Sequence, residues 1–367
     1  MNEMRTKYRF LFAGGGTGGH LFPAIAVADK IKSLIPEAEI MFVGTKSRIE
    51  GRIVPQLGYN FRPIWIKGFP RKFSAANLLF PLKLLVSVIQ SVVINMKFKP
   101  KVAIGSGGYV SGPAIFGANV MGAKIILLEQ NSYPGITTRL LEKYAKEIHL
   151  SFEDSKKYFR VKENLKVTGN PVRENLIRID REDALKEFEL SASKKTLLIL
   201  GGSLGARSIN EAVASTVKEF VVKGLQVIWQ TGNSGYKLYK KFNSESVKVF
   251  PFIDEMNFAY SACDLLIARA GGLTIAEFLK LGIPCVLIPS PNVAENHQYF
   301  NAKSLIEQKA AILIEDKDIK DGFFNEVNNL IGNENLLSEL RKNCLKIAKP
   351  NAASVIAESA IKYAEAI

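Results

Sequence analysis

Two glycine-rich segments, one in each half of the chain, constrain the fold more than any other feature. Gly14–His20 follows an apolar run over Tyr8–Ala13, and Gly201–Arg207 follows a second apolar run over Thr196–Leu200. Each segment precedes a helical pattern, so its backbone N–H groups can hold an anion at the N-terminus of that helix. Two such turns at equivalent points of two halves predict two nucleotide-fold domains that face a shared cleft.

Strand-like and helical patterns alternate along both halves. This alternation predicts the α/β class, with two Rossmann-like parallel sheets that carry helices on both faces. Ligands of such sheets bind beyond the carboxyl ends of the strands, where both glycine-rich segments lie. Strands are predicted at Arg9–Ala13, Glu39–Val43, Asn60–Ile66, Val102–Gly105, Lys124–Glu129 and Glu147–Phe152, and then at Thr196–Leu200, Gln226–Gln230, Val247–Phe252, Leu265–Ala268, Cys285–Ile288 and Ala311–Ile314.

The length of 367 residues favours about two domains, and a turn-type segment at Gly169–Pro171 marks the boundary between them. We expect a first domain over residues 1–171 and a second over residues 172–349. The last helical pattern, Ala352–Ala364, has no strand after it. We therefore expect residues 350–367 to cross back and pack on the first domain.

The side chains that commonly bind metals are few. The 3 cysteines show no metal-type or Cys-x-x-Cys spacing, so we expect them to be small core residues in a reducing, cytoplasmic compartment. A histidine-based metal site is not expected from 3 histidines. Asp316-Lys317-Asp318 has the Asp-x-Asp pattern but lies in a charged loop, and we expect it to be solvated surface. No metal or other cofactor is indicated.

The formal net charge of +14 has an uneven distribution, because no acidic residue occurs between Glu50 and Glu129. Within that stretch lies a very apolar segment, Phe73–Phe98. Polar residues interrupt it at helical spacing, which predicts one polar stripe on a broadly apolar helix that does not span a membrane. The interrupting residues are Lys83, Ser87, Gln90, Ser91 and Asn95.

Three interpretations of this basic, apolar segment remain open. It can be a core crossover helix, or a surface where apolar side chains ringed by basic ones meet anionic lipid. Binding of nucleic acid is the third, but no nucleic-acid-binding motif accompanies the charge, so no nucleic-acid partner is expected. The residues expected in a membrane patch are Phe73, Leu78, Leu79, Phe80, Lys72 and Lys83.

The first glycine-rich turn supports neither of the common nucleotide cofactors. A dinucleotide site needs an acidic residue at the end of the second strand, and that strand ends in Gly44-Thr45-Lys46 instead. A P-loop needs Gly-Lys-Ser/Thr, and this turn closes with Gly19-His20. His20 stands at the start of a helix, where the helix dipole favours the neutral imidazole. It is therefore either the base that accepts a proton from an attacking hydroxyl or a structural residue of the turn.

A second candidate cluster follows a buried strand in the second half. Ala270–Glu277 begins a helix with small residues, which permit close approach of a ligand, and Thr274 and Glu277 share one helical face. Glu277 can accept two hydroxyl donors from a ribose, or can simply be a first-turn glutamate stabilised by the dipole. The following polar loop ends in Glu295, Asn296, His297 and Gln298, side chains that suit sugar hydroxyls and solvent equally.

These residues together resemble the MurG family, the bacterial N-acetylglucosaminyltransferases that convert undecaprenyl-pyrophosphoryl-MurNAc-pentapeptide (lipid I) to lipid II in peptidoglycan synthesis. Eight segments match in family order across nearly the whole chain, and together they are highly specific. They are GGGTGGHLFPA (14–24), GSGGYVSGP (105–113), EQN (129–131), GNPVR (169–173), GGSLGAR (201–207), PFIDEM (251–256), ARAGGLTIAE (268–277) and HQYFNA (297–302).

The resemblance implies the GT-B fold and a UDP-GlcNAc site mainly in the second domain. Within that site Ile253 would meet uracil, Glu277 the ribose, Ser203 the diphosphate and Gln298 the GlcNAc hydroxyls. It also implies a peripheral enzyme on the cytoplasmic face of the inner membrane, with lipid I, anionic lipid and other cell-wall and division proteins as partners. The residues implied to contact UDP-GlcNAc are Thr17, Gly18, Gly19, Asn131, Arg173, Ser203, Ile253, Gly272, Leu273, Thr274, Glu277 and Gln298.

The chemistry that the resemblance implies is a single inverting displacement by the MurNAc C4 hydroxyl, with His20 as the base. Helix N-termini and Arg173 would replace a metal at the diphosphate. The chain departs from the commonest family pattern at Leu128, Leu204 and His297. These departures affect which residues contact UDP-GlcNAc and leave the implied reaction unchanged.

Rival functions predict different products. Other GT-B enzymes, of the lipid-A disaccharide synthase or UDP-GlcNAc 2-epimerase type, are the nearest alternative, but the paired GGGTGGH and GGSLGAR argue against both. A nicotinamide-dependent oxidoreductase would need the missing ribose carboxylate. A non-catalytic sugar-nucleotide-binding scaffold would bind UDP-GlcNAc and form no product.

Overall fold

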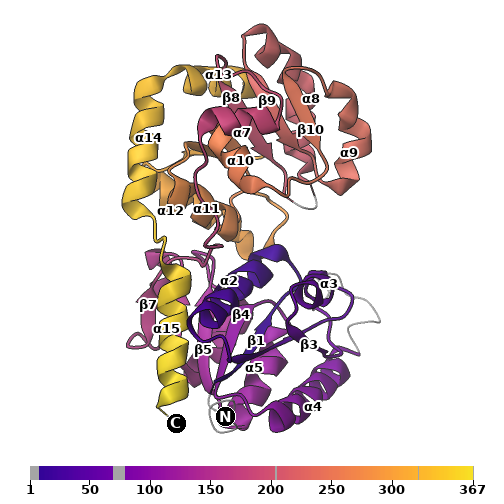
Figure 1. Ribbon diagram of the computed structural model, residues 1–367, viewed down its shortest axis with the longest axis vertical. Helices are drawn as coiled ribbons and strands as arrows, with labels where there is room; N and C mark the ends of the chain where they lie inside the picture. Colours follow the sequence, from indigo (N-terminus) through magenta and orange to yellow (C-terminus); the bar gives the residue numbers. More distant parts are fainter. Residues whose placement is uncertain (1–7, 69–78, 203–204, 321, 367) are drawn as a thin grey trace. The chain divides into compact units, whose positions relative to one another are not determined.

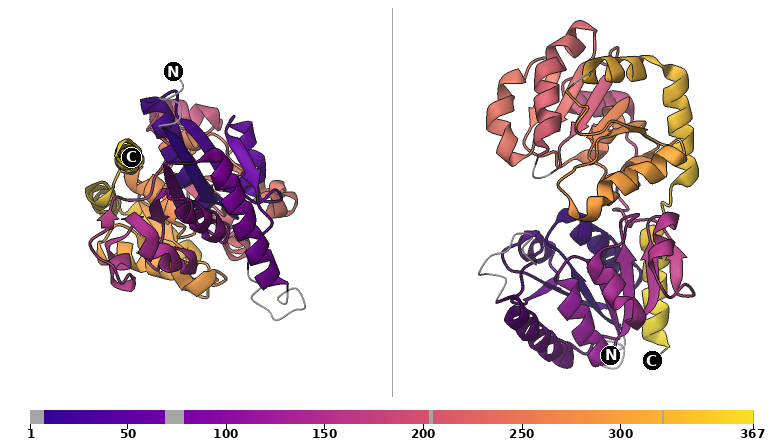
Figure 2. Two further views of the ribbon diagram at one scale, coloured as in Figure 1. Left: turned by 90° about the horizontal axis from the view of Figure 1, so that it is seen from below. Right: turned by 180° about the vertical axis from the view of Figure 1, so that it is seen from behind.

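The chain folds into two units, each built on one parallel sheet. In the computed structural model, unit 1 comprises Met1–Arg173 and Lys349–Ile367, and unit 2 comprises Glu174–Ala348. Residues 8–68, 79–202, 205–320 and 322–366 are described. Both sheets carry helices on their two faces (Figures 1 and 2), which confirms the α/β, Rossmann-like prediction.

The sheet of unit 1 has seven strands in the order β3-β2-β1-β4-β5-β6-β7, and every neighbouring pair is parallel. The order reverses between β1 and β4, and ligands of such sheets bind outside the strand ends at this switch point. The strands are β1 (Arg9–Gly14), β2 (Glu39–Gly44), β3 (Asn60–Pro63), β4 (Val102–Gly107), β5 (Lys124–Glu129), β6 (Ala145–Leu150) and β7 (Leu165–Val167).

The sheet of unit 2 repeats this topology with six parallel strands, in the order β10-β9-β8-β11-β12-β13. Its switch point lies between β8 and β11. The strands are β8 (Thr196–Leu200), β9 (Gln226–Gln230), β10 (Val247–Phe250), β11 (Leu265–Ala268), β12 (Cys285–Leu287) and β13 (Ile312–Leu313).

Helices connect the strands in both units. Those of unit 1 are α2 (Gly18–Leu34), α3 (Ile49–Gln56), α4 (Phe80–Phe98), α5 (Ser111–Val120), α6 (Ile136–Leu141), η2 (Glu142–Tyr144), η3 (Glu153–Tyr158) and α15 (Ala352–Glu365). Those of unit 2 are α7 (Arg181–Glu187), α8 (Arg207–Val222), α9 (Asn233–Tyr239), η4 (Lys240–Phe242), α10 (Met256–Ala262), α11 (Gly272–Leu281), η5 (Ala294–Asn296), α12 (His297–Glu307), α13 (Phe323–Gly332) and α14 (Glu334–Ile347).

Every predicted strand is present, although several ends differ. β3 ends at Pro63, three residues before the predicted end, and β6 begins at Ala145, two residues before the predicted start. The short edge strand β7 was not predicted, because three residues hold too little alternation to mark a strand. The cysteines Cys263, Cys285 and Cys344 are all buried, as predicted.

The C-terminal helix α15 returns to unit 1, as predicted, and lies alongside α2 (Figure 1). Its apolar stripe, which includes Ile356 and Ala360, joins the core formed by β1, β4 and α2. On the same helix Ser359 and Tyr363 donate hydrogen bonds to Glu147 of β6. The helix is therefore fixed both by apolar packing and by a buried carboxylate.

Helix α4 buries three residues of its polar stripe and leaves an apolar stripe exposed, although Phe98 at its end joins the core and Ile94 packs against it. Ser87, Ser91 and Asn95 are buried and donate hydrogen bonds to the helix backbone one turn earlier. These small residues allow close packing on α5, since a Cβ added to Gly117 would lie 2.8 Å from the Ser91 Cβ. The outward stripe consists of Leu82, Leu85, Ile89, Val93 and Met96, each between 40% and 58% exposed.

This arrangement differs from an ordinary core helix, whose apolar stripe faces inward. Serine hydroxyls that bond to their own helix backbone need no outside partner, so they can be buried against another helix at low cost. Among the described residues, α4 alone is long and apolar enough to cross a membrane by length and composition. That it does not span stays a prediction.

Candidate active site

The predicted base, His20, lies at the switch point of the sheet of unit 1. It belongs to the first turn of α2, which follows β1, and it contacts residues at the ends of β4 and β5. Its Nδ1 lies 3.0 Å from the carbonyl oxygen of Ser106 and 3.2 Å from Oε1 of Gln130. The side chain is half-buried. The position of the imidazole is therefore set by residues at the ends of three strands, β1, β4 and β5.

The partners of Nδ1 decide the tautomer. Both are acceptors, since Ser106 offers a backbone carbonyl and the Gln130 amide directs its nitrogen to the carbonyl of Leu128. Nδ1 therefore carries the hydrogen in the neutral ring, and Nε2 carries the lone pair. This is the tautomer that a general base needs when a second group orients it.

Glycines make room for this ring and for the strand that holds it. A Cβ added to Gly107, which has φ of 95°, would lie 2.7 Å from the His20 Nδ1. A Cβ added to Gly14 would overlap the Ser106 hydroxyl, which donates a 2.6 Å hydrogen bond to the carbonyl of His20. Larger residues at either position would displace the imidazole.

The predicted contact residue Asn131 is held by the buried carboxylate of Glu129. Glu129 accepts hydrogen bonds from the Asn131 backbone N–H at 3.0 Å, from the Asn131 amide at 3.3 Å and from the Gly135 N–H at 3.0 Å. Burial raises the pKa of Glu129, although these hydrogen bonds and one from Thr138 partly offset that rise. The carboxylate shapes the loop that carries Asn131.

The predicted donor-site residues of unit 2 follow the ends of its strands. Gly272, Leu273, Thr274 and Glu277 lie in the first turns of α11, directly after β11 at the switch point. The phenol of Tyr260 in α10 donates a 2.8 Å hydrogen bond to the Glu277 carboxylate. Burial, and then the charge of Glu277, raise the pKa of Tyr260 well above its ordinary value, so the hydroxyl stays a donor.

Two further predicted residues are tied to neighbouring loops. The buried Ile253 donates its backbone N–H to the Gln230 side chain at 2.9 Å. Gln298 of α12 accepts a 2.8 Å hydrogen bond from the Ser290 N–H through its amide oxygen. Glu295 and Asn296, just before α12, both have positive φ, at 52° and 51°.

The remaining predicted residues are more exposed or lie outside the described part of the chain. Thr17 and Gly19 are exposed and Gly18 is partly exposed at the N-terminus of α2, and Arg173 is exposed at the end of unit 1. Ser203 lies outside the described residues, as do Lys72, Phe73 and Leu78 of the expected membrane patch. Of that patch, Leu79 is exposed and Phe80 and Lys83 are partly exposed.

The prediction of solvated surface for Asp316-Lys317-Asp318 is wrong for Asp316. Its side chain is only 20% exposed and is paired with Arg269, which also donates to the carbonyls of Ile288 and Pro289. Ser208 of α8 donates to the same carboxylate at 2.5 Å. The cluster ties together the ends of β11, β12 and β13. The sequence did not predict this ion pair, because Asp316 lies 47 residues from Arg269 in the chain.

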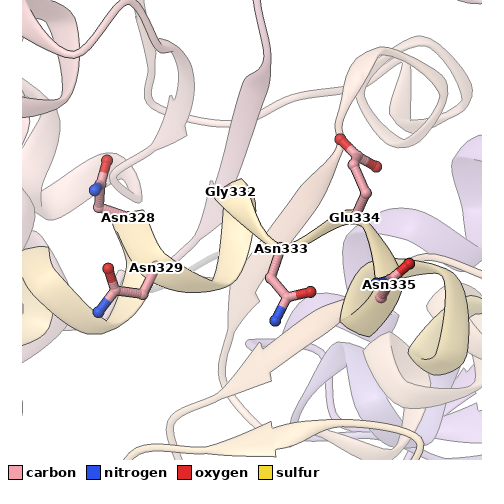
Figure 3. A pocket seen from close by; sticks show the side chains of 6 residues that line it. All are labelled: Asn328, Asn329, Gly332, Asn333, Glu334 and Asn335. Atoms are coloured by element: carbon pink, nitrogen blue, oxygen red, sulfur yellow. The ribbon is translucent and has the colours of Figure 1, made fainter.

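Groups that could hold a metal ion are absent from the described part of the chain, where no three His, Cys, Asp or Glu side chains are suitably clustered. A surface hollow at the junction of α13 and α14 contains none of the predicted site residues. Its side chains do not converge on one point (Figure 3), so they do not form a ligand-binding site. It is lined by Asn328, Asn329, Gly332, Asn333, Glu334 and Asn335.

The sequence did not single out several residues that hold this site. The positioning groups on His20 and Glu277 lie far from them in the chain and belong to no nucleotide-binding pattern. The signal available in the sequence was that Ser106, Gln130 and Arg269 stand within the quoted segments GSGGYVSGP, EQN and ARAGGLTIAE. The residues are Ser106, Gln130, Gln230, Tyr260 and Arg269.

Comparisons with known proteins agree with this layout. The glycosyltransferase family 28 N-terminal domain matches residues 10–150, and the glycosyltransferase family 28 C-terminal domain matches residues 196–359. The UDP-N-acetylglucosamine--N-acetylmuramyl-(pentapeptide) pyrophosphoryl-undecaprenol N-acetylglucosamine transferase of Flavobacterium psychrophilum is 42% identical over 362 residues, which is 98% of each chain.

Solved structures give the same result. The crystal structure of Acinetobacter baumannii MurG has a TM-score of 0.77 at 28% identity, covering 96% of this chain and 99% of that one. UDP-GlcNAc 2-epimerase from Neisseria meningitidis has a TM-score of 0.65 at 14% identity over 96% and 99% of the chains, which shows a shared fold alone. The chain therefore belongs to glycosyltransferase family 28 and, within it, to the MurG family of N-acetylglucosamine transferases.

Proposed function

We propose that this enzyme moves GlcNAc from UDP-GlcNAc to the C4 hydroxyl of MurNAc in undecaprenyl-pyrophosphoryl-MurNAc-pentapeptide, with inversion at the anomeric carbon. The observation that carries the proposal is the oriented imidazole of His20, at the sheet switch point of a chain similar to such transferases over 98% of its length. A single displacement needs a base for the acceptor hydroxyl and stabilisation of the leaving diphosphate.

His20 is the proposed base. Nε2 takes the proton of the C4 hydroxyl while that oxygen bonds to C1 of GlcNAc, and the bond from C1 to the diphosphate oxygen breaks, so that UDP leaves with the electron pair. The imidazolium that forms keeps its Nδ1–H directed at the Ser106 carbonyl and the Gln130 amide oxygen. Both partners are acceptors, and they stabilise the charged ring.

Unit 2 is the proposed donor-binding unit. Glu277, oriented by Tyr260, accepts the ribose hydroxyls. Because Ile253 donates its N–H to Gln230, its carbonyl oxygen is the group that would receive the uracil N3–H. The amide oxygen of Gln298 is taken by Ser290, so its NH₂ group would donate to a GlcNAc hydroxyl. Ser203 is proposed at the diphosphate. Further donor contacts are proposed for Thr17, Gly18, Gly19, Asn131, Gly272, Leu273 and Thr274.

We expect the reaction to proceed without a metal ion or other cofactor. Arg173 and the backbone N–H groups at helix N-termini would stabilise the charge that develops on the diphosphate. Preorganised donors of this kind contribute ~3 kcal/mol each in the transition state. Transfer in the presence of a chelator tests this expectation.

The outward face of α4 is the proposed membrane contact, on the cytoplasmic side of the inner membrane, where the lipid acceptor is anchored. Trp65, which is 50% exposed, donates its backbone N–H to Gln90 of α4 at 2.7 Å, and the Lys83 ammonium lies 5.7 Å from the centre of its ring. An exposed tryptophan, a lysine and an apolar stripe are the groups that favour the lipid–water interface. Other cell-wall and division proteins are proposed partners.

A radiolabel transfer assay tests the proposed reaction. With labelled UDP-GlcNAc and a water-soluble lipid I analogue, we expect label in the acceptor and one UDP released for each transfer. Label in free ManNAc or UDP-ManNAc, with none in the acceptor, would instead indicate an epimerase. Binding of UDP-GlcNAc without any product would indicate a scaffold, and enhanced NADH fluorescence on titration an oxidoreductase.

A further inference from the structure

The first glycine-rich turn already holds an anion from its own chain. Glu50, the second residue of α3, is 1% exposed, and its carboxylate lies against the turn that follows β1. Oε2 accepts a 2.9 Å hydrogen bond from the Gly16 N–H. Oε1 accepts from the Thr45 N–H at 3.0 Å and from the Thr45 hydroxyl at 2.6 Å. One carboxylate thus joins the end of β1 to the end of β2.

The turn is shaped around this side chain. A Cβ added to Gly15 would overlap the Glu50 carboxyl group, and a Cβ added to Gly44 would lie 2.5 Å from the Glu50 Cγ. Gly16 itself has φ of 85°, which favours glycine. Two glycines therefore make room for the carboxylate, and a third supplies the N–H that it accepts.

Nucleotide-binding folds place a ligand phosphate on the N–H groups of this turn, between the first strand and its helix. Here the Gly16 N–H is bound by a side chain instead. The residue after it, Thr17, is the N-cap of α2, and its carbonyl accepts from the His20 N–H at 3.3 Å. Only the four residues Gly16–Gly19 of one turn separate the group that binds Glu50 from His20.

We propose that Glu50 is a positioning residue for the transfer reaction: it occupies the anion position of the first glycine-rich turn and thereby holds His20 in place. The inference rests on the proposed role of His20. The proposal also gives the two turns different functions. The Gly16 N–H of the first turn binds Glu50 and no phosphate, so the diphosphate is bound by the other groups proposed for the donor.

The contact geometry requires a carboxylate and not its amide. In Glu50→Gln one oxygen becomes an NH₂ group. The remaining oxygen favours the side with two donors, the Thr45 N–H and hydroxyl, so the NH₂ group faces the Gly16 N–H, donor against donor. The turn should shift, and displacement of a catalytic group by about 1 Å can lower the rate about 100-fold.

A double-mutant cycle on kcat tests the proposal, with the full-length enzyme, UDP-GlcNAc and a water-soluble lipid I analogue. Glu50→Gln should lower kcat by about tenfold or more in the wild-type background. In the His20→Ala background the same change should have less than about a twofold effect, because residues that act through one group are not additive. UDP affinity, measured by calorimetry, should not change.

Glu142→Gln is the matched control. Glu142 is also a buried carboxylate of unit 1, and it accepts from the Arg160 N–H, away from the glycine-rich turn. It should leave kcat unchanged. If Glu142→Gln lowers kcat as much as Glu50→Gln does, or if Glu50→Gln and His20→Ala are additive, the proposal is overturned.

Two further outcomes separate this inference from the proposed function. If Glu50→Gln does not fold, Glu50→Asp replaces it in the cycle, since the shorter side chain cannot reach Gly16 and Thr45 together, and the same result is expected. If His20→Ala lowers kcat and neither Glu50 variant does, Glu50 is not a positioning residue. If His20→Ala retains full kcat, His20 is not the base, and the proposed function of His20 is contradicted before the role of Glu50 is tested.

Discussion

The Nδ1 of His20 lies 3.0 Å from the carbonyl oxygen of Ser106, 86 residues away in the chain. A backbone carbonyl can only accept, so this contact fixes the hydrogen on Nδ1 whatever the orientation of the neighbouring Gln130 amide. The same two residues are joined a second time, because the Ser106 hydroxyl donates to the His20 carbonyl at 2.6 Å. The end of β4 thus sets both the position and the tautomer of the proposed base.

Removal of the imidazole should lower the rate and leave donor binding intact. We expect His20→Ala to reduce kcat by roughly 10²–10⁴-fold, the range for loss of a general base. Gln130→Leu, which leaves the Ser106 carbonyl in place, should reduce kcat by much less. Steady-state transfer and calorimetric UDP binding check both. An unchanged kcat for His20→Ala would rule out the role.

The contact between Tyr260 and Glu277 should be visible in donor binding. Tyr260→Phe removes the donor that orients the carboxylate. The KM for UDP-GlcNAc should rise, and the upper limit is about tenfold to 100-fold, which is what about 1.5–3 kcal/mol for a hydrogen bond to a charged group would give if it were lost entirely from donor binding. Glu277→Ala should raise KM further. In the double variant Tyr260→Phe should add little. Kinetics unchanged by Glu277→Ala would return this residue to a stabilising role at the helix N-terminus.

The outward stripe of α4 should bind lipid. Replacing Leu85 and Ile89, which are 58% and 55% exposed, with serine should weaken sedimentation with vesicles that contain anionic lipid. Turnover of a water-soluble acceptor should persist, because the inward face of the helix is untouched. Val222→Ser, at an 85% exposed position of unit 2, is the control and should bind vesicles as the wild type does. Equal binding by all three proteins would exclude α4 as the contact.

The stability of unit 1 should depend on the ionisation of Glu147. Burial by itself raises the pKa of Glu147, but hydrogen bonds from His149, Lys166 and Ser359 outweigh it and hold the pKa well below 4.5. A folded-state pKa below the unfolded value gives stability that is present above the unfolded pKa and is lost as the pH falls. Unfolding free energy should therefore decline on acidification below about pH 4.5.

Glu147→Gln should remove this part of the acid dependence. The slope of unfolding free energy against pH should decrease by at most about 1.4 kcal/mol per pH unit, the limit for one proton. Chemical denaturation at a series of pH values measures it. Glu153→Gln, which removes only an exposed pair with Lys156, should match the wild-type slope. Parallel slopes for wild type and Glu147→Gln would show that Glu147 is not responsible.

Much of the fold followed from local patterns. Alternation of strands and helices predicted both sheets, and the absence of a strand after Ala352 predicted that the last helix returns to unit 1. His20 stood out because it directly follows a glycine-rich turn and because that turn matches neither nucleotide motif completely. These inferences use residues that are neighbours in sequence, where period and turn chemistry act directly.

The sequence by itself determined the two parallel sheets, their glycine-rich turns and the family, because each of these is recognised from a pattern of residues that are neighbours in the chain. Tertiary structure alone decided that α4 buries Ser87, Ser91 and Asn95 and exposes an apolar stripe. The sequence pattern shows that two faces of a helix differ, but it does not show which face packs against the rest of the protein. Tertiary structure also decided that Ser106 orients His20, that Arg269 buries Asp316, and that Glu50 fills the first turn. Each of these depends on strand order, which brings together side chains that are 34 to 86 residues apart.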